Sequence, residues 1–173
     1  FESNGGKGIA APSANRFGHV SPTTAQAVSE ELSAYLAADD VVLDGGPSLV
    51  GVESTIIDCT SDLPRILRPG AITEEMIETA TDSALSQAGN EIRVSGSLEN
   101  HYAPEAKVVL DVSPQPGDGF IALATTQTPA GVIRLAAPLT HEEFARILYS
   151  SLRSADQQKL ARVVVHQPLG DDI

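Results

Sequence analysis

Small hydroxyl and amide side chains gather in one stretch near the start of the chain, AAPSANRFGHVSPTT. Ser13, Asn15 and Arg16 directly follow GIAAP (8–12), which we predict to be a short buried strand. Groups at the carboxyl end of a strand face the crevice in which α/β sheets bind ligands. The stretch therefore suggests a site for a polar, anionic small molecule. A capped turn, which uses the same residue types, is the alternative.

Ser21 and Pro22 predict the start of a helix that runs to about Ala37. Serine is a favourable N-cap, and proline fits the first helical position because its missing N–H is not needed there. The free N–H groups of a helix N-terminus can also bind a phosphate, so Ser21 is a candidate for both roles.

Ser54 and Thr55 lie in a segment rich in β-branched residues, 50–59, which predicts a strand. If these hydroxyls face inward, they need polar partners or a ligand; a solvent-exposed sheet face is the alternative. Glu53 should point to the opposite face from Ser54, because side chains alternate along a strand.

Arg68 ends the segment ILRPG, where Pro69 and Gly70 stop a predicted strand. A guanidinium fixed at a strand end can bind a phosphate or a carboxylate through two parallel hydrogen bonds. The chain has a net charge of −12, and residues 1–80 contain four cations, Lys7, Arg16, Arg65 and Arg68. Because cations are scarce, we predict a binding role for Arg68 rather than a surface ion pair.

Charge and composition exclude several classes of protein. Without a basic stripe, a broad nucleic-acid surface is not expected, and we predict no direct, stable nucleic-acid binding. No apolar run in the sequence approaches the roughly 18 residues of a membrane span. The single Cys59, beside Ile56 and Ile57, predicts a buried or half-buried thiol in a reducing compartment, which favours a cytoplasmic location. The sequence shows neither a zinc pattern nor a covalent nucleophile.

The elements that would position these residues form two α/β units joined by a linker. In the first unit, residues 1–80, Thr73 should cap a second helix, and strands are predicted at 8–12, 41–46, 50–59 and 64–68. Residues 81–104 are small and polar, which predicts a linker. His101 and Tyr102 interrupt this composition, so the linker either folds over a site or is anchored to one of the units.

The second unit comprises residues 105–173. A capping-box pattern at Thr140 predicts a helix with Phe144 and Leu152 on its apolar face. Apolar runs predict strands at 107–112, 119–125, 130–136 and 161–168. The order strand-strand-strand-helix-strand indicates a small α/β unit with some parallel pairing.

Six motifs, in this order and at these intervals, resemble threonylcarbamoyl-AMP synthases of the Sua/YrdC type: APSANRFG, SPTT, DGGP, VGVESTIID, ILRPGAIT and HYAP. The resemblance implies the C-terminal part of a YrdC-like twisted open sheet with helices, a linker, and a small Rossmann-like α/β C-terminal domain. Two departures are visible. The family's N-terminal half, with its Lys-x-Arg signature, does not precede these motifs, so we expect a fragment. Residues 95–100, ahead of HYAP, also differ from the Gly-Met-Lys-like sequence usual in relatives.

The resemblance also implies a nucleotidyltransferase that makes threonylcarbamoyl-AMP and pyrophosphate from L-threonine, bicarbonate and ATP, with Mg²⁺. Its product would feed a downstream tRNA-modifying transferase complex that forms threonylcarbamoyladenosine. Ser13, Ser21, Arg68 and Tyr102 would bind ATP, Ala11 (through its backbone) and Ser54 would hold threonine, and Asn15 and Thr55 would shape the pocket. We expect the 173 residues alone to be inactive. The alternative is a non-catalytic RNA-binding or translation-associated regulatory module, which the acidic charge disfavours.

Overall fold

The computed structural model describes residue 5 and residues 13–16, 18–86 and 103–169. The helices in this part of the chain are α1 (Ala25–Leu32), α2 (Glu74–Thr81) and α3 (His141–Gln157). The strands are β1 (Ile56–Asp58), β2 (Arg65–Arg68), β3 (Lys107–Leu110), β4 (Gly119–Ile121), β5 (Ile133–Ala136) and β6 (Arg162–Val165). The predicted α/β class is confirmed. Below, residues 13–86 are called the N-terminal part and residues 103–169 the C-terminal part. The strand predicted at 8–12 and most of the predicted linker lie outside the described residues.

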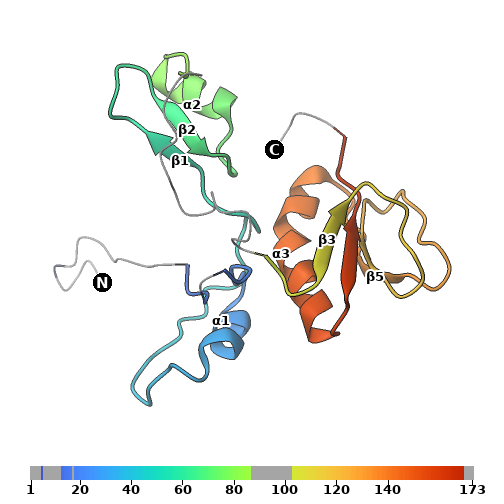
Figure 1. Cartoon of the computed structure of the whole chain (residues 1–173). Helices are drawn as coiled ribbons and strands as arrows, with labels where there is room; N and C mark the ends of the chain where they lie inside the picture. Colours follow the sequence, from blue (N-terminus) through green and yellow to red (C-terminus); the bar gives the residue numbers. More distant parts are fainter. Residues whose placement is uncertain (1–4, 6–12, 17, 87–102, 170–173) are drawn as a thin grey trace.

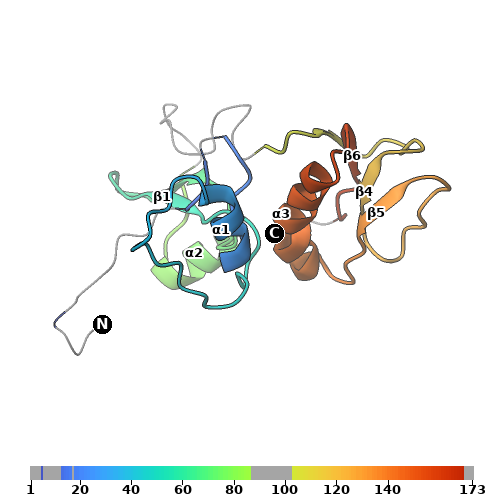
Figure 2. The ribbon, with the colours of Figure 1, turned by 90° about the horizontal axis from the view of Figure 1, so that it is seen from below.

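The C-terminal part is a parallel sheet in the order β3-β6-β4-β5. Helix α3 covers the face of this sheet that is turned toward the N-terminal part (Figures 1 and 2). Ile121, Val163 and Val165 from the sheet pack against Phe144 and Leu152 of α3. The predicted order of elements and the parallel pairing are therefore confirmed, and the larger hydrophobic cluster among the described residues lies between α3 and the sheet.

Helix α3 begins where the capping box predicts it. The Thr140 hydroxyl accepts a hydrogen bond from the Glu143 amide at 3.2 Å, and the Glu143 carboxylate accepts one from the Leu139 amide at 2.7 Å. The first bond satisfies an N–H group of the first helical turn, and the second satisfies the N–H group of the residue before the cap.

The N-terminal part contains a two-stranded antiparallel sheet, in which β1 pairs with β2. Thr73 caps α2 as predicted, and Ile77 on this helix is buried. The prediction for Cys59 is wrong, because its side chain is exposed. Strand β1 ends at Asp58, so Cys59 lies in the connection to β2 rather than in a buried strand.

Helix α1 does not start at Ser21 as predicted. Its N-cap is Thr24, whose hydroxyl accepts a hydrogen bond from the Ala27 amide at 3.1 Å, and the helix ends at Leu32 rather than near Ala37. The residue before the cap has a bond outside the helix, since the Thr23 carbonyl accepts from the Ser48 amide at 2.8 Å. Ser21 therefore does not lie at a helix N-terminus.

Of the strands predicted in the N-terminal part, the one at 41–46 is absent and the one at 50–59 is shorter than predicted. Residues 41–46, all of them described, form no strand, and Val41 and Leu43 are 75% and 85% exposed. The strand predicted at 50–59 is limited to β1. A strand persists only where a neighbour bonds to its backbone, and β2 reaches Ile56–Asp58 alone. The strand predicted at 64–68 is confirmed as β2.

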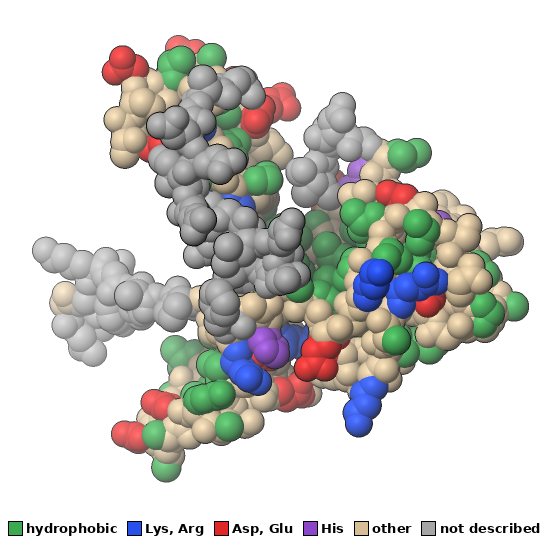
Figure 3. All heavy atoms as spheres, in the orientation of Figure 1, with side chains coloured by type: hydrophobic (Ala, Val, Ile, Leu, Met, Phe, Trp, Pro, Cys, Tyr) green, Lys and Arg blue, Asp and Glu red, His purple; other side chains and the backbone are tan. Residues whose placement is uncertain are grey.

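None of the helices among the described residues is long and apolar enough to cross a bilayer. On the face shown in Figure 3, Lys and Arg side chains lie in small separate groups rather than in a stripe.

Candidate functional site

Arg68 is bound to the backbone of Ser54. Its Nε and Nη2 atoms donate to the Ser54 carbonyl at 3.0 and 2.9 Å, and Nη2 also donates to the Ser54 hydroxyl at 3.2 Å. The Arg68 side chain is only 14% exposed, and it projects from the last residue of β2. The hydrogen bonds to Ser54 therefore hold the guanidinium at the end of the strand, and Arg68 also forms an ion pair with an acid, Glu53, which was the alternative to a binding role. The Nε–Nη2 edge, which could grip a phosphate, donates here to Ser54.

Glu53 connects Arg68 to Ser21. One carboxylate oxygen lies 3.6 Å from Arg68 Nη2, and the other accepts a hydrogen bond from the Ser21 hydroxyl at 2.5 Å. The prediction that Glu53 points away from the face of Ser54 is wrong, because both residues contact Arg68. Side-chain alternation applies to regular strands, and residue 53 precedes the start of β1.

Thr55 and Gly70 hold the two segments of the site together. The Thr55 hydroxyl donates to the Ile72 carbonyl at 2.8 Å and accepts from the Ile72 amide at 3.1 Å. Gly70 packs so closely on residues 53–55 that a Cβ atom there would collide with the Glu53 carbonyl and the Thr55 amide. Glycine is required at this position because two backbones meet there.

Ser13 and Asn15 form a hydrogen-bonded turn. The Ser13 hydroxyl donates to the Asn15 side-chain oxygen at 2.5 Å, and the Asn15 amide donates to the carbonyls of Arg16 and His19 at 3.2 and 2.9 Å. Ala14 has a φ of +54°, which is uncommon outside glycine and confirms a tight turn. The capped-turn interpretation of this stretch is therefore correct for its local structure, and a ligand role remains compatible with it.

The structure brings three of the predicted site residues together: Ser21, Ser54 and Arg68 meet around Glu53. Ser13 and Asn15 lie in the adjoining turn, which leads through His19 to Ser21. Ala11 and Tyr102, predicted to contact threonine and ATP, lie outside the described residues.

Sequence reasoning missed Glu53 as a member of the site. A signal was available, since an acid within the apolar run VGVESTIID, beside two hydroxyls and in a segment with few cations, needs an explanation. A carboxylate that is largely removed from solvent is expected to have a charged or hydrogen-bonding partner, and Glu53 has both.

The cluster offers a guanidinium, a carboxylate and two hydroxyls, which suits recognition of a charged polar ligand through hydrogen bonds. Within the described residues there is no group of three or more His, Cys, Asp or Glu side chains that could hold a metal ion. The chemistry that this arrangement supports is the orientation of bound groups and the stabilisation of their charge.

Comparison with known proteins places both parts of the chain in families. Residues 2–70 match the model of Sua5, YciO and YrdC proteins, described as "Telomere recombination". Residues 72–172 match the model described as "Threonylcarbamoyl-AMP synthase, C-terminal domain". Threonylcarbamoyl-AMP synthase of Bacillus subtilis is 35% identical over 178 residues, covering 90% of this chain and 51% of the relative. The Pyrococcus abyssi synthase is 36% identical over 113 residues, covering 62% and 32%. The chain thus spans about half, or less, of the length of these relatives.

Solved structures agree with the sequence matches. The crystal structure of P. abyssi Sua5 complexed with L-threonine superposes with a TM-score of 0.71 at 26% identity, covering 91% of this chain and 52% of that chain. A variant of P. abyssi Sua5 gives 0.67 at 27% identity, covering 92% and 51%. With the YrdC-type motifs followed by a matching C-terminal domain, the chain belongs to the Sua5/YrdC-type threonylcarbamoyl-AMP synthase family.

Proposed function

We propose that this chain is part of a longer enzyme that makes threonylcarbamoyl-AMP from L-threonine, bicarbonate and ATP. The observation that supports this most directly is the meeting of Ser21, Ser54 and Arg68 around Glu53. These residues are far apart in the sequence, and each belongs to a motif that resembles the family. The threonine complex of P. abyssi Sua5 supports threonine as a substrate of this chain as well.

In the proposed site, Ser13, Ser21 and Arg68 bind ATP, and Ser54 holds threonine. Arg68 must exchange some of its bonds to Ser54 for bonds to phosphate oxygens, since the Nε–Nη2 edge is engaged. Asn15 and Thr55 shape the pocket through the turn and the segment contacts described above. Ala11 and Tyr102 are proposed to complete the threonine and ATP contacts.

The proposed reaction is an adenylation. The threonine amine attacks bicarbonate, and a carbamate forms with loss of water. A carbamate oxygen then attacks the α-phosphorus of ATP, the bond from this phosphorus to the bridging oxygen breaks, and pyrophosphate leaves. The residues of the site orient the reactants and balance phosphate charge. Mg²⁺ is proposed to arrive as the counter-ion of ATP, as part of the substrate, because magnesium commonly relies on phosphate and water ligands.

We further propose that the chain divides into residues 1–80, a linker at 81–104 and residues 105–173, and that it acts in the cytoplasm upstream of a tRNA-modifying complex. Val41, Leu43 and Leu49 are 75%, 85% and 92% exposed. Their exposure supports an additional region of the synthase that packs on them. On this basis residues 1–173 alone should form no threonylcarbamoyl-AMP, and measurable synthesis by them would contradict this part of the proposal.

Replacing Arg68 tests the proposed function in the full-length protein. We expect Arg68→Ala to reduce ATP-dependent pyrophosphate release by about a hundredfold or more, because a fixed donor to phosphate charge is lost. Arg65→Ala is the matched control. Arg65 lies three residues earlier on the same strand and pairs with Asp58 at 3.0 Å, away from the cluster.

The assay follows pyrophosphate and threonylcarbamoyl-AMP together, with ATP, threonine and bicarbonate omitted in turn. Loss of activity in Arg68→Ala with retention in Arg65→Ala supports the proposed role. Near-normal turnover of Arg68→Ala would remove Arg68 from the site, and product formation without threonine would contradict the proposed substrate.

A further inference from the structure

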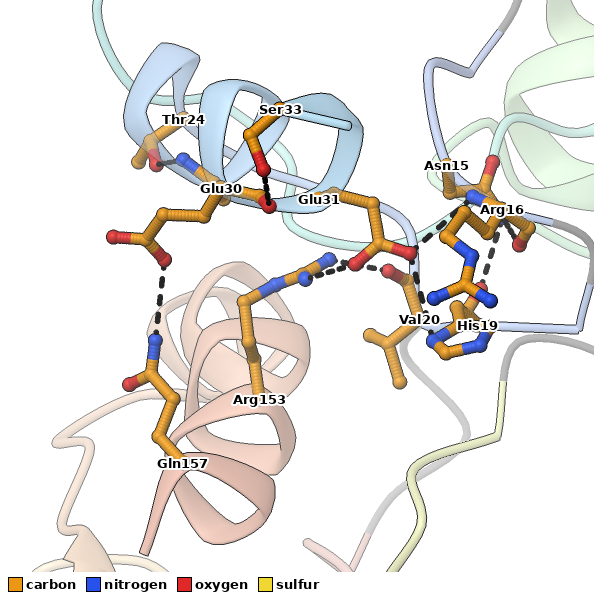
Figure 4. Close-up of polar contacts among 11 residues, drawn as sticks. Asn15, Arg16, His19, Val20, Thr24, Glu30, Glu31, Ser33, Arg153 and Gln157 are labelled. Carbon is orange, nitrogen blue, oxygen red and sulfur yellow. Dashed lines mark hydrogen bonds and ion pairs between the residues drawn. The ribbon is translucent and has the colours of Figure 1, made fainter. Parts of the chain in front are cut away.

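Helix α3 of the C-terminal part carries an arginine that reaches into the N-terminal part (Figure 4). Arg153 Nη1 donates to one carboxylate oxygen of Glu31 on α1 at 3.0 Å, and Nη2 donates to the Val20 carbonyl. The Arg153 and Glu31 side chains are only 17% and 9% exposed. Hydrogen bonds between charged groups are shorter and stronger than those between neutral groups, and low exposure limits their screening by salt.

Glu31 also contacts the turn that contains Ser13. Its second carboxylate oxygen accepts from the Arg16 amide at 3.4 Å and lies 3.5 Å from His19 Nδ1. Arg16 and His19 are the residues whose carbonyls accept the Asn15 amide. One carboxylate therefore joins Arg153 to both ends of the turn that Asn15 closes.

The environment of Glu31 supports its ionised form. Burial raises the pKa of this carboxyl, but the hydrogen bonds from Arg153 and the Arg16 amide, with the nearby charges of His19 and Arg153, outweigh burial and lower the pKa overall. Glu31 is thus a carboxylate that needs its partners, and removing Arg153 would leave a shielded charge poorly compensated.

Val20 forms the second branch of the network. Its side chain is 4% exposed and belongs to the hydrophobic cluster that includes Phe144, Leu152 and Ala155 of α3. The residue is thus held twice by the C-terminal part, through its side chain and through its carbonyl. Ser21 follows directly in the sequence, and its hydroxyl donates to Glu53, which also contacts Arg68.

Two further contacts come from the same face of α3. Gln157, one helical turn after Arg153, donates to Glu30 at 3.3 Å. Gly51, two residues before Glu53, packs on the backbone of Arg146, where a Cβ atom would collide with the Arg146 carbonyl. Helix α3 therefore contacts the chain directly beside both serine-containing segments of the site.

We infer that Arg153 is a positioning residue, through which the C-terminal part sets the geometry of the turn from Ser13 to Ser21. This inference deepens the proposed function and rests on it for the identity of the ligand. Arg153 acts through Glu31 on the side of Ser13 and through Val20 on the side of Ser21. The C-terminal part thereby has a role in nucleotide binding without contributing a residue that touches the nucleotide.

The test compares Arg153→Met with Arg153→Lys in the full-length protein. Methionine keeps much of the apolar stem but loses every donor, whereas lysine keeps the charge without the fork that serves two acceptors. We expect Arg153→Met to raise the KM for ATP by about tenfold, the equivalent of one lost charged hydrogen bond. The KM for bicarbonate should change little, and Arg153→Lys should restore part of the loss.

Arg162→Met is the matched control. Arg162 also forms an ion pair with a largely buried carboxylate, that of Asp118, but both residues belong to the C-terminal part. A purely structural effect would appear in both variants. The positioning role predicts a raised KM for ATP in Arg153→Met and an unchanged one in Arg162→Met. It also predicts that the double variant Arg153→Met/Glu31→Gln weakens apparent ATP binding, in free energy, by less than the sum of the two single variants.

Hydrogen exchange gives a readout that does not depend on activity. In Arg153→Met the amides of Arg16 and residues 18–21 should exchange about tenfold faster, while those of β4 and β6 keep their protection. Unchanged exchange in this turn together with an unchanged KM for ATP would overturn the inference. If the wild-type protein made no threonylcarbamoyl-AMP, the proposed function would fail, but the exchange difference would still decide whether Arg153 positions the turn.

Discussion

The N-terminal and C-terminal parts of the chain are each stabilised in a different way. In the C-terminal part, Ile121 and Val163 pack against α3, Phe120 and Val164 belong to a second hydrophobic cluster, and all four are at most 1% exposed. In the N-terminal part, large apolar side chains such as Leu43 are exposed, and the site segments are joined by hydrogen bonds from Arg68 and Thr55. The C-terminal part therefore has a core of its own, whereas the geometry of the site depends on polar contacts and on its neighbour.

This contrast explains how a ligand site can be polar and still have a defined geometry. Directional hydrogen bonds can be exchanged for bonds to a ligand, which packed apolar side chains cannot do. The cost is that such segments have few buried contacts and open more readily. Contact with the firmly packed α3 reduces this freedom where Val20 and Gly51 meet the helix.

The largest expected effect comes from emptying the core of the C-terminal part. Phe120 is 1% exposed, with its ring edge-on to His166 at a centroid distance of 4.8 Å. We expect Phe120→Ala to lower the free energy of unfolding by about 3–5 kcal/mol through loss of burial and the cavity left behind. Urea denaturation followed by circular dichroism measures it.

The matched change in the N-terminal part is Ile57→Ala on β1. Ile57 is 36% exposed, so its removal should cost about 1 kcal/mol or less. Equal losses for the two variants would contradict the view that the two parts differ in how they are stabilised.

A smaller effect is expected where the two parts touch. Gly51→Ala should destabilise by about 1–3 kcal/mol, since its Cβ would force the Arg146 backbone away. Gly45→Ala is the control, because a Cβ there meets no atom within 4 Å, and it should change stability by about 0.5 kcal/mol or less. The same denaturation experiment compares them. A neutral Gly51→Ala would show that the contact between the parts is loose.

The smallest expected effect is a loss of folding stability at low pH, through Asp118. The hydrogen bond from Arg162 lowers the pKa of Asp118; burial opposes it, and the Gln115 amide and the charge of Arg162 add to it. A carboxyl whose pKa is lowered by folding stabilises the protein fully above its unfolded pKa of about 3.9, and this stabilisation is lost as the pH falls through the lower folded value. Stability should therefore drop below about pH 4.

Asp118→Asn should make the free energy of unfolding less dependent on pH below about 4. Asp39→Asn, at an exposed carboxyl of the N-terminal part, serves as the comparison. If both variants keep the full acid dependence, the Asp118–Arg162 pair is not a source of it.

The sequence predicted the C-terminal part better than the N-terminal part. Its strands are short apolar runs, and the α3 start carries a capping box, so local signals and tertiary packing agree. In the N-terminal part the apolar runs at 41–46 and 50–55 resemble strands equally well. They lack strand neighbours among the described residues, and no local pattern reveals whether a neighbour exists.

The sequence predictions named single residues of the candidate site but not how they are arranged. Arg68 and Ser54 were chosen for their positions beside Pro69 and within VGVESTIID, and the structure brings them into contact. Ser21 was assigned to a helix start, which Thr24 provides instead. Because Ser21 does not cap the helix, its hydroxyl donates a hydrogen bond to Glu53 instead.

The sequence by itself determined the α/β class, the family and the presence of parallel strand pairs in the C-terminal part, because these depend on local periodicity and on motifs in a fixed order. The tertiary structure alone decided that Glu53 lies at the centre of the site and that Arg153 reaches Glu31. The physical reason is distance along the chain: Arg153 and Glu31 are 122 residues apart. A charge pair between such residues has no local signature, and it exists only once two separately packed elements lie side by side.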